Sequence, residues 1–328
     1  MPRIVVTGAG GFLGNCLVRH LALLGHEVVA FGRSAESLDA LKGEHFTIVV
    51  CDLADAAAQP APGISGRVDA IVHCAGLSSN WGPRSAFERD NVDATANLLD
   101  LARAWGTPHF VHVSSASVYF SFCDQLDVHE TFPLPTPVNN YAWSKVAAEE
   151  LVRAASDFPT TIVRPRGIYG RGDRALLPRL LRAAASGPIP LFRGGRAVID
   201  LTHVDDVAAA IACILDHGDA TAGVTYNVSG GEAVSIHDLI LRSAKLAGID
   251  VQWRNVSWPV GFAAVRAVEA FHQVFRPAVE PVVTAYSAGL LAFSQTLNLH
   301  AIRNDIGWRP AISFDEGLRR TFSDSVSA

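Results

Sequence analysis

The sequence predicts an α/β fold in which a doubly wound parallel sheet is covered by helices on both faces, with a smaller C-terminal domain. Three observations support this prediction. In the first half of the 328-residue chain, apolar runs of strand length alternate with amphipathic runs of helix length. The strand-length runs are apolar on both faces, which is typical of strands inside a parallel sheet. After Gly170 the alternation weakens, and proline and glycine become frequent.

The predicted elements follow one another as strand, helix and strand. Six runs are expected to be buried strands: Arg3–Thr7, Glu27–Phe31, Phe46–Val50, Ala70–His73, Phe110–Ser114 and Thr160–Arg164. Three segments between them are expected to be helices: Phe12–Leu24, Phe87–Trp105 and Tyr141–Ala155. The segment Ala222–Val228 is expected to return to the sheet as a further strand. We therefore expect residues 1–170, with return elements around 196–230, to form the first domain, and residues 171–195 and 231–328 to form the second.

Composition narrows the class of protein. The chain is 49% apolar and 18% charged, as expected for a globular protein, and its net charge of −5 without a basic stripe argues against nucleic-acid binding. The five cysteines are isolated and predict neither a disulfide framework nor, with the scattered histidines, a metal site. The N-terminus lacks a signal-peptide pattern and no apolar run spans a membrane, so a cytoplasmic location is expected. The oligomeric state stays open, with a homodimer as one alternative.

A glycine-rich turn directly follows the first predicted strand and leads into an amphipathic helix. Glycines at its first, fourth and seventh positions suit a tight turn, close approach of the backbone to a pyrophosphate, and close packing of the helix on the strand. The pyrophosphate would lie at the helix N-terminus, where N–H groups favour anions. The alternative is an ordinary strand–helix turn. The pattern predicts a dinucleotide site of the Rossmann type, with these contacts: Gly8, Gly11, Phe12, Leu13 and Gly14.

The end of the second predicted strand indicates which dinucleotide binds. NAD-selective enzymes normally place an acidic residue there, but this chain has Gly32 followed by Arg33. A guanidinium would pair with a 2′-phosphate, so NADP(H) is the preferred prediction. Arg33 as a solvated loop residue is the alternative, and NAD(H) stays open because Glu36 would reach a ribose if the loop bends back. Further cofactor contacts are expected after the third and fourth strands, at Asp52, Leu53, Ala75 and Gly76.

A tyrosine and a lysine lie four residues apart at the start of a predicted helix. This spacing puts Tyr141 and Lys145 on one face. A phenol with its ordinary pKa of about 10 is a poor base at neutral pH, and a nearby ammonium favours the phenolate. The fifth predicted strand ends in the hydroxyl-rich run Val113–Tyr119, where Ser115 is expected to hold the reacting oxygen near Tyr141. This ordered combination predicts hydride transfer to or from an oxygen-bearing carbon.

With these motifs, the chain resembles the extended short-chain dehydrogenase/reductase family, also called the NAD-dependent epimerase/dehydratase family. The similar segments are TGAGGFLG, DL at 52–53, HCAG at 73–76, RDNVDAT, VSSASVY, YAWSK, RPRGIYGRGD at 164–173 and THVDDVA at 202–208. By this resemblance Ser115, Tyr141 and Lys145 are the catalytic residues, and Tyr141 and Lys145 also contact the cofactor. The resemblance further implies that these residues line the nicotinamide end: Asn91 and the segment Arg164–Tyr169, with Pro165 and Ile168.

The substrate expectation depends on departures from the nucleotide-sugar enzymes of this family. Gly167 stands where those enzymes usually carry asparagine, and Ile199 stands where they carry an arginine that grips the diphosphate. Arg193 or Arg196 would have to replace that charge. The C-terminal third is more similar to the 3β-hydroxysteroid dehydrogenase and 2-alkyl-3-oxoalkanoate reductase branch, in the segments Ser79–Gly82, Glu280–Thr284 and Asp305–Pro310.

The resemblance therefore implies an NAD(P)-dependent enzyme that interconverts a secondary alcohol and a ketone on a bulky apolar substrate, steroid-like or long-chain, bound by the smaller domain. A nucleotide-sugar epimerase, dehydratase or reductase is the alternative. A third alternative is a dinucleotide sensor without enzymatic activity. The intact pair of Tyr141 and Lys145 argues against this alternative.

The segment Trp258–Phe275 is amphipathic at helical spacing. One face is apolar, with Val260, Ala264, Ala267, Val268, Phe271, Val274 and Phe275, and the other carries Arg266, Glu269 and Gln273. Three interpretations stay open: a cap helix packed on its own domain, an apolar substrate entrance, or shallow contact with a membrane surface.

Overall fold

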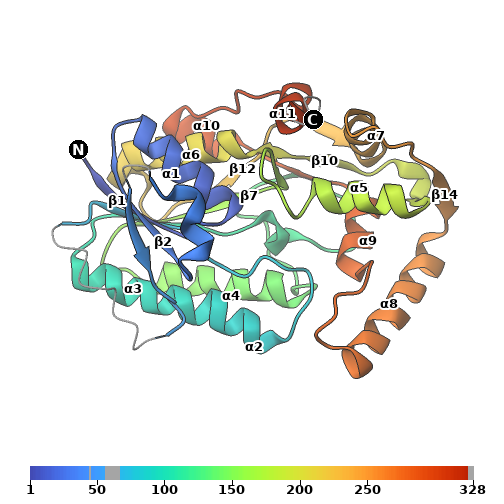
Figure 1. The fold of residues 1–328 in the computed structure, drawn as a ribbon, viewed down its shortest axis with the longest axis horizontal. Coiled ribbons are helices and arrows are strands. Elements are labelled where there is room, and N and C mark those ends of the chain that lie inside the picture. The colour runs from blue at the N-terminus through green and yellow to red at the C-terminus, as the bar shows by residue number, and fades with distance from the viewer. Residues whose placement is uncertain (44–45, 56–66, 324–328) are drawn as a thin grey trace.

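The computed structural model describes residues 1–43, 46–55 and 67–323. Its centre is a seven-stranded parallel sheet with the strand order β12-β7-β5-β4-β1-β2-β3 (Figure 1). The strands are β1 (Arg3–Thr7), β2 (Glu27–Gly32), β3 (Thr47–Val50), β4 (Ala70–His73), β5 (Phe110–Val113), β7 (Thr160–Pro165) and β12 (Thr225–Val228). The predicted doubly wound α/β fold is confirmed. The strand order reverses between β1 and β4, and such switch points are where sheets of this type bind ligands.

Helices cover both faces of this sheet, which explains why its strands are apolar throughout. On one face α1 (Phe12–Leu23) packs against α6 (Val204–His217), and α10 (His300–Ile306) packs beside them. On the other face lie α3 (Ala94–Trp105) and α4 (Asn140–Ala154) (Figure 1).

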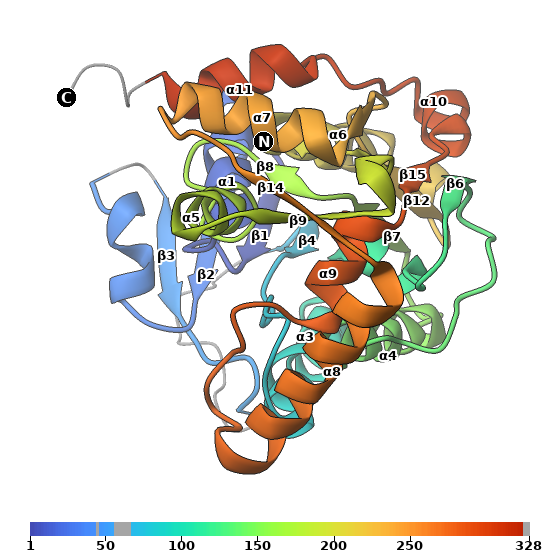
Figure 2. The ribbon, with the colours of Figure 1, turned by 90° about the vertical axis from the view of Figure 1, so that its right-hand side faces the viewer.

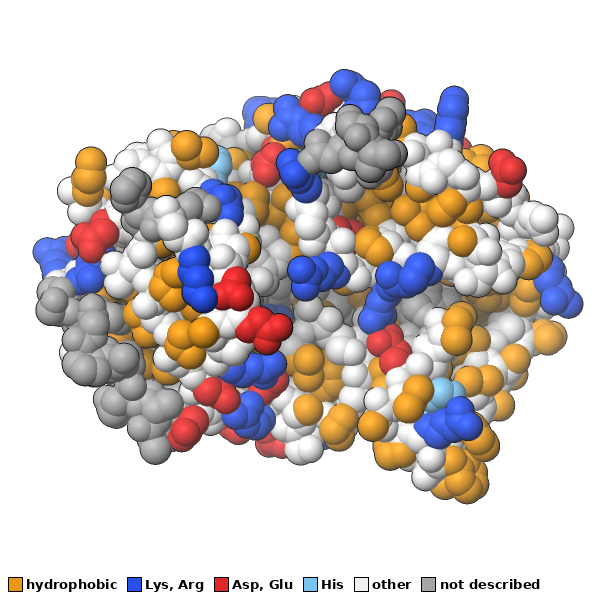
Figure 3. All heavy atoms as spheres, in the orientation of Figure 1, with side chains coloured by type: hydrophobic (Ala, Val, Ile, Leu, Met, Phe, Trp, Pro, Cys, Tyr) orange, Lys and Arg blue, Asp and Glu red, His pale blue; other side chains and the backbone are white. Residues whose placement is uncertain are grey.

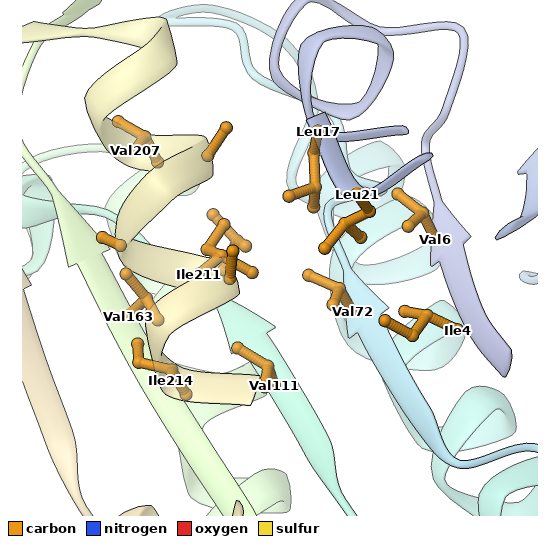
Figure 4. Packing of buried hydrophobic residues seen from close by; sticks show 14 of the residues in the cluster. Ile4, Val6, Leu17, Leu21, Val72, Val111, Val163, Val207, Ile211 and Ile214 are labelled. Carbon is orange, nitrogen blue, oxygen red and sulfur yellow. The ribbon is translucent and has the colours of Figure 1, made fainter. Parts of the chain in front are cut away.

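Neighbouring residues of β1 enter opposite cores because side chains alternate along a strand. Val6 packs with Leu17 and Ile211 in the core beneath α1 and α6 (Figure 4). Val5 packs with Leu98 in the core beneath α3.

The expected helix Phe87–Trp105 starts earlier and is interrupted. A short helix α2 (Arg84–Phe87) runs into a π-helical segment, Glu88–Asp93, before α3 begins. A π-helical turn holds an extra residue and is frequent at functional sites. Here it turns the Asn91 side chain into the interior.

A second, smaller sheet has the order β13-β10-β15-β6, and its strands β15 and β6 are labelled in Figure 2. It consists of β13 (Ala233–Ser235), β10 (Val198–Asp200), β15 (Gln295–Leu297) and β6 (Gln125–Val128), so one strand comes from the first half of the chain. Two short pairs accompany it, β8 (Ile168–Tyr169) with β11 (Thr202–His203) and β9 (Ile189–Phe192) with β14 (Trp253–Val256). The helices around these strands are α5 (Leu177–Ser186), α7 (Ile236–Leu246), α9 (Ala285–Ala292) and α11 (Phe314–Phe322). The domain boundary near residue 170 stays a prediction.

The helix α8 (Trp258–Phe275) projects from the rest of the molecule (Figures 1 and 2). Its apolar face is solvent-exposed: Val260, Val268, Phe271, Val274 and Phe275 are between 47% and 71% exposed. The helix does pack on its own domain, through Trp258, Phe262 and Val265, but the predicted apolar face takes no part in this packing. The inner face holds Glu269, which is buried because its carboxylate accepts hydrogen bonds from Arg266 at 3.0 Å and from the Ala285 N–H at 2.7 Å. No helix in the described part of the chain is long and apolar enough to cross a membrane.

Candidate active site

A pocket of about 460 Å³ opens where the strand order reverses, at the carboxyl ends of β1 and β4. Its walls come from the turns after β1 and β2, the ends of β3 and β4, and the start of the π-helical segment. Seven of the predicted cofactor residues contribute to these walls: Gly8, Gly11, Arg33, Asp52, Leu53, Ala75 and Gly76. The pocket therefore brings together residues that are far apart in the sequence. The predicted contacts at Phe12, Leu13, Pro165 and Ile168 lie outside these walls and stay predictions.

The glycine turn forms one end of the pocket. Gly8 has a positive φ of 66°, and a Cβ at this position would lie 2.7 Å from the Ala75 nitrogen. A Cβ on Gly14 would overlap the Gly8 carbonyl oxygen, and one on Gly10 would overlap the Ser37 carbonyl oxygen. The helix α1 begins after Gly11 without a side-chain cap, so its first-turn N–H groups remain for an anion. The turn thus fits the pyrophosphate of a dinucleotide, and Gly10 is a required glycine that the sequence analysis missed.

Arg33 lies at the opposite end, where its guanidinium donates to the Asp90 carboxylate at 2.9 Å. The Arg33 side chain is 64% exposed, so both the contact with a 2′-phosphate and the alternative of a solvated loop residue stay open. Ser34 and Ser37 line the pocket beside Arg33, and neither was predicted. Two hydroxyls within four residues of an arginine after the second strand were the available signal. Glu36 is exposed and is not among the wall residues.

The catalytic residues lie at the start of α4 and at the end of β5. The Asn139 side chain caps α4 by accepting the Ala142 N–H at 2.8 Å, which fixes the first turn that carries Tyr141. The Ser115 hydroxyl lies close enough to the Tyr141 phenol to lower its pKa. Lys145, one turn further on, donates from Nζ to the Val113 carbonyl at 3.0 Å. The structure therefore brings all three predicted residues to the end of one strand.

Burial controls the protonation of the two ionisable members. It raises the pKa of Tyr141 to about 12, although the nearby Ser115 hydroxyl acts in the opposite direction. Burial also lowers the pKa of Lys145 to about 8, and its Nζ donates to the Val113 carbonyl. The raised pKa of Tyr141 favours its protonated form, and the lysine-stabilised phenolate stays a prediction.

Asn91 connects the pocket wall with the catalytic helix. Its Oδ1 accepts the Leu77 N–H, and its Nδ2 donates to the Leu77 carbonyl at 3.1 Å and to Ser144 Oγ at 2.8 Å. Leu77 lines the pocket, and Ser144 precedes Lys145 on α4. Asn91 thus positions both sides of the site, while its contact with a nicotinamide stays a prediction.

Arg164, which the resemblance placed at the nicotinamide end, has a structural role instead. Its guanidinium forms a two-point ion pair with Glu149, with a distance of 2.8 Å from Nε, and both side chains are buried. It also donates to the Tyr119 hydroxyl. The ion pair joins β7 to α4 and leaves this arginine no role toward a ligand.

Two further residues lie near Tyr141. Arg166 belongs to the segment Arg164–Tyr169 that the resemblance placed at the nicotinamide end, whereas Tyr286 was missed. Tyr286, at the start of α9, lies close enough to Tyr141 to raise its pKa. The buried Arg166 in turn lies close enough to Tyr286 to lower its pKa, against the stronger effect of burial. No sequence signal identifies Tyr286, because only tertiary packing brings its ring onto Phe120.

Aromatic side chains continue from Tyr286 toward α8. Its ring packs edge-to-face on Phe120 with centroids 5.1 Å apart, and Phe122 packs on Phe120 at 5.6 Å. Phe262 of α8 then packs on Phe122 at 5.0 Å. We call Phe120, Phe122, Phe262 and Tyr286 the aromatic wall.

Comparison with known proteins agrees with this architecture. The model of the NAD dependent epimerase/dehydratase family matches residues 4–229. The 2-alkyl-3-oxoalkanoate reductase of Stenotrophomonas maltophilia (strain K279a) is 31% identical over 338 residues, which cover 99% of this chain and 100% of the relative. The 3-beta-hydroxysteroid dehydrogenase of Mycolicibacterium neoaurum is 26% identical, with 97% of this chain and 90% of the relative covered.

A solved structure shows the same fold over the whole chain. The dTDP-glucose 4,6-dehydratase DesIV from Streptomyces venezuelae, with NAD and TYD bound, superposes with a TM-score of 0.75 at 26% identity, covering 99% of this chain and 97% of that one. The predicted resemblance is confirmed by the family model and by these relatives. The chain belongs to the NAD-dependent epimerase/dehydratase family and is an oxidoreductase of that family.

Proposed function

We propose that the protein interconverts a ketone and a secondary alcohol on a bulky apolar substrate, with NADP(H) as the preferred cofactor and Tyr141 as the acid and base. The observation that carries this proposal is the position of Tyr141 at the start of α4, with Ser115 close enough to lower its pKa and Lys145 one turn further along the helix. A bound nicotinamide would supply or accept the hydride. The residues of the chain then have to bind the reacting oxygen of the substrate and to transfer one proton to or from it.

In the direction of ketone reduction, Ser115 holds the carbonyl oxygen by a hydrogen bond and Tyr141 donates its proton to that oxygen. A phenol with a pKa of about 12 is fully protonated at neutral pH and is ready to donate. Lys145 places a positive charge at the end of β5, which stabilises the negative charge that develops on the oxygen. In the oxidative direction the same phenol has to accept a proton, which requires its deprotonated form.

The surroundings of Tyr141 support an apolar substrate. The aromatic wall presents ring surface at the partly exposed Phe122, Phe262 and Tyr286. Arg193, one of the two arginines that would have to compensate for Ile199, is bound to both oxygens of Asp124 at 2.9 and 2.7 Å. Ile199 itself is buried in the core of the smaller domain. The reductase and dehydrogenase relatives act, by their names, on oxoalkanoates and hydroxysteroids, which agrees with this proposal.

The cofactor preference is supported by the group at the adenosine end of the pocket. Arg33, Ser34 and Ser37 offer a guanidinium and two hydroxyls, the donors that a 2′-phosphate needs. Asp90 holds Arg33 in place and would have to release it when a phosphate binds.

We also propose that the exposed face of α8 contacts a lipid surface, from which an apolar substrate reaches the site. Side chains of this face, together with Val279 and Val282, gather at the projecting end of the helix (Figure 3). Arg276 follows α8 there and would meet lipid phosphates. The Trp81 indole donates to the Pro277 carbonyl at 3.0 Å, and Asn140 donates to the Gly82 carbonyl at 3.0 Å, so one loop joins this tip to the catalytic helix.

The function is tested with a panel of candidate substrates. NADPH oxidation is followed with long-chain ketones, 3-oxo acids, steroid ketones and nucleotide sugars, and binding of UDP and dTDP is measured by calorimetry. We expect turnover of apolar ketones and no binding of either nucleotide. Micromolar UDP or dTDP binding together with turnover of a nucleotide sugar would overturn the proposal in favour of the alternative.

A further inference from the structure

We infer that Arg166 binds a carboxylate of the substrate, so that the substrate class is an apolar keto acid or hydroxy acid. This inference rests on the proposed function and refines it. It assigns a specificity role to a residue that is outside the cofactor pocket and does not take part in proton transfer.

The first step is the unsatisfied state of the Arg166 guanidinium. The residue follows β7 and is only 6% exposed. Its Nε and Nη2 atoms are buried and have no hydrogen-bond partner in the part of the chain that the structure describes. A buried guanidinium without partners is costly, because it has lost water and gained no acceptor. By contrast Arg164, two residues earlier, is fully paired with Glu149.

The second step is the local charge. The buried Asp200 is near enough for Arg166 to lower its pKa, although burial has the larger effect and raises it. Asp200 accepts the Leu297 N–H at 2.8 Å, and no ion pair joins it to Arg166 among the described residues. The carboxylate therefore offsets part of the guanidinium charge from a distance. The partly offset charge of the Arg166 guanidinium favours a ligand with a single negative charge over a diphosphate.

The third step is the position of Arg166 relative to the reacting groups. Val113 of β5 lies opposite Val163 of β7, so Ser115 and Arg166, which follow these strands, lie at the same edge of the sheet. Arg166 also acts electrostatically on Tyr286, and Tyr286 acts on Tyr141. The aromatic wall starts at Tyr286 and leads away toward α8. A substrate whose oxygen is held at Tyr141 and whose apolar chain follows this wall would present a nearby carboxylate to Arg166. The planar fork of a guanidinium matches the two oxygens of a carboxylate.

The test compares 3-hydroxytetradecanoic acid with two compounds that lack its charge, the methyl ester of this acid and 2-tridecanol. Their oxidation with NADP⁺ is measured for the wild type, Arg166→Met, Arg166→Lys and a control, Arg196→Met, which removes an exposed arginine. We expect Arg166→Met to lower kcat/KM for the acid about 10- to 100-fold and to leave the two uncharged alcohols nearly unchanged. Arg166→Lys should restore part of the loss, and Arg196→Met should have no effect.

Equal losses for all three substrates, with a lower Tm, would show that Arg166 only supports the fold and would overturn the inference. Binding of tetradecanoate to the NADP⁺-loaded protein, measured by calorimetry, tests the anion site separately. If no alcohol is oxidised but tetradecanoate binding still falls 10- to 100-fold in Arg166→Met, the proposed function fails and the carboxylate site stands. Tetradecanoate binding that is unchanged in Arg166→Met, or UDP binding that is lost in it, would contradict the carboxylate assignment.

Discussion

Tyr141 and Lys145 share one face of α4, where Lys145 is buried and Tyr141 is partly buried, and the loss of water shifts their pKa values in opposite directions. Removing water disfavours the charged form of each, so the pKa of the phenol rises to about 12 and the pKa of the ammonium falls to about 8. Between these values the tyrosine keeps its proton while the lysine has lost its charge. Lys145 therefore sets the upper limit of the pH range in which Tyr141 is protonated and Lys145 is charged.

This difference predicts the pH dependence of ketone reduction. Below pH 8 Lys145 is protonated and can stabilise the developing oxyanion, and above pH 8 that charge is lost, so kcat/KM should fall. In Lys145→Arg the guanidinium does not titrate, and the fall should move to higher pH. The profiles are measured with saturating NADPH, and thermal unfolding confirms that the variant is folded. A fall at the same pH in both proteins would exclude Lys145 as its origin.

The pair of Asp90 and Arg33 predicts how the preference between NADPH and NADH responds to mutation. Arg33→Ala should weaken NADPH binding about tenfold or more, because a charge-assisted contact to the 2′-phosphate is lost, and should leave NADH binding unchanged. Asp90→Asn should have the opposite effect on the preference, since it frees Arg33 from a partner at 2.9 Å. Fluorescence titration with both cofactors measures the two ratios. Equal affinities for NADPH and NADH in the unmodified protein would contradict the assigned preference.

Residue identities inside short motifs were predictable, and their distant partners were not. Gly8, Gly14 and the pair of Tyr141 and Lys145 follow from local spacing, because a turn or a helix fixes their geometry within a few residues. The partner of Arg33 lies 57 positions away in sequence. Arg166 lies in a recognised motif, but its neighbour Tyr286 reaches it only through tertiary packing, so no local pattern reveals Tyr286.

At the scale of elements, the glycine turn shows how steric space overrides helix propensity. In an unconstrained helix interior, replacing glycine by alanine stabilises the helix. In Gly14→Ala the added methyl group would overlap the Gly8 carbonyl oxygen, so we expect a loss of about 1–3 kcal/mol in the free energy of unfolding and weaker cofactor binding.

The matched control is Gly11→Ala, where the nearest atom to an added Cβ is the Gly8 oxygen at 3.1 Å. Denaturant unfolding measures both variants. Similar stability of Gly14→Ala and Gly11→Ala would show that the turn has more room than the structure indicates.

The helix α8 shows what an amphipathic pattern leaves undetermined. The inner side of α8 is formed by Trp258, Phe262 and Val265, which the sequence analysis did not assign to either face. Glu269 joins this inner side because it pairs with Arg266 and accepts the Ala285 N–H at the start of α9. The satisfied carboxylate can therefore be buried while the valines and phenylalanines stay exposed. Similarly, the pattern over Phe87–Trp105 predicted a helix but not the π-helical segment around Asn91.

At the scale of the whole molecule, α8 places an apolar surface at one projecting corner (Figure 3). We expect the protein to cosediment with phosphatidylcholine vesicles, and more strongly when phosphatidylserine is added, because Arg276 lies beside the apolar face. The double variant Phe271→Ser and Val274→Ser should lose this association without a change in Tm, since both side chains are at least half exposed.

Leu23→Ser is the control, because Leu23 is 88% exposed on α1, at another site. Vesicle binding that survives the double variant would contradict the assignment to α8. A dimer in sedimentation velocity that the double variant dissociates would show that a second copy covers this face instead.

The central claim is that Tyr141 exchanges a proton with the oxygen of an apolar ketone or alcohol while the dinucleotide pocket holds the cofactor. The most direct measurement is the rate of NADPH oxidation with a substrate found in the panel, compared between the wild type and Tyr141→Phe. We predict a secondary alcohol as product and a fall in kcat of about 10²- to 10⁴-fold in the variant, with NADPH affinity unchanged. A Tyr141→Phe enzyme that keeps most of its turnover would contradict the account.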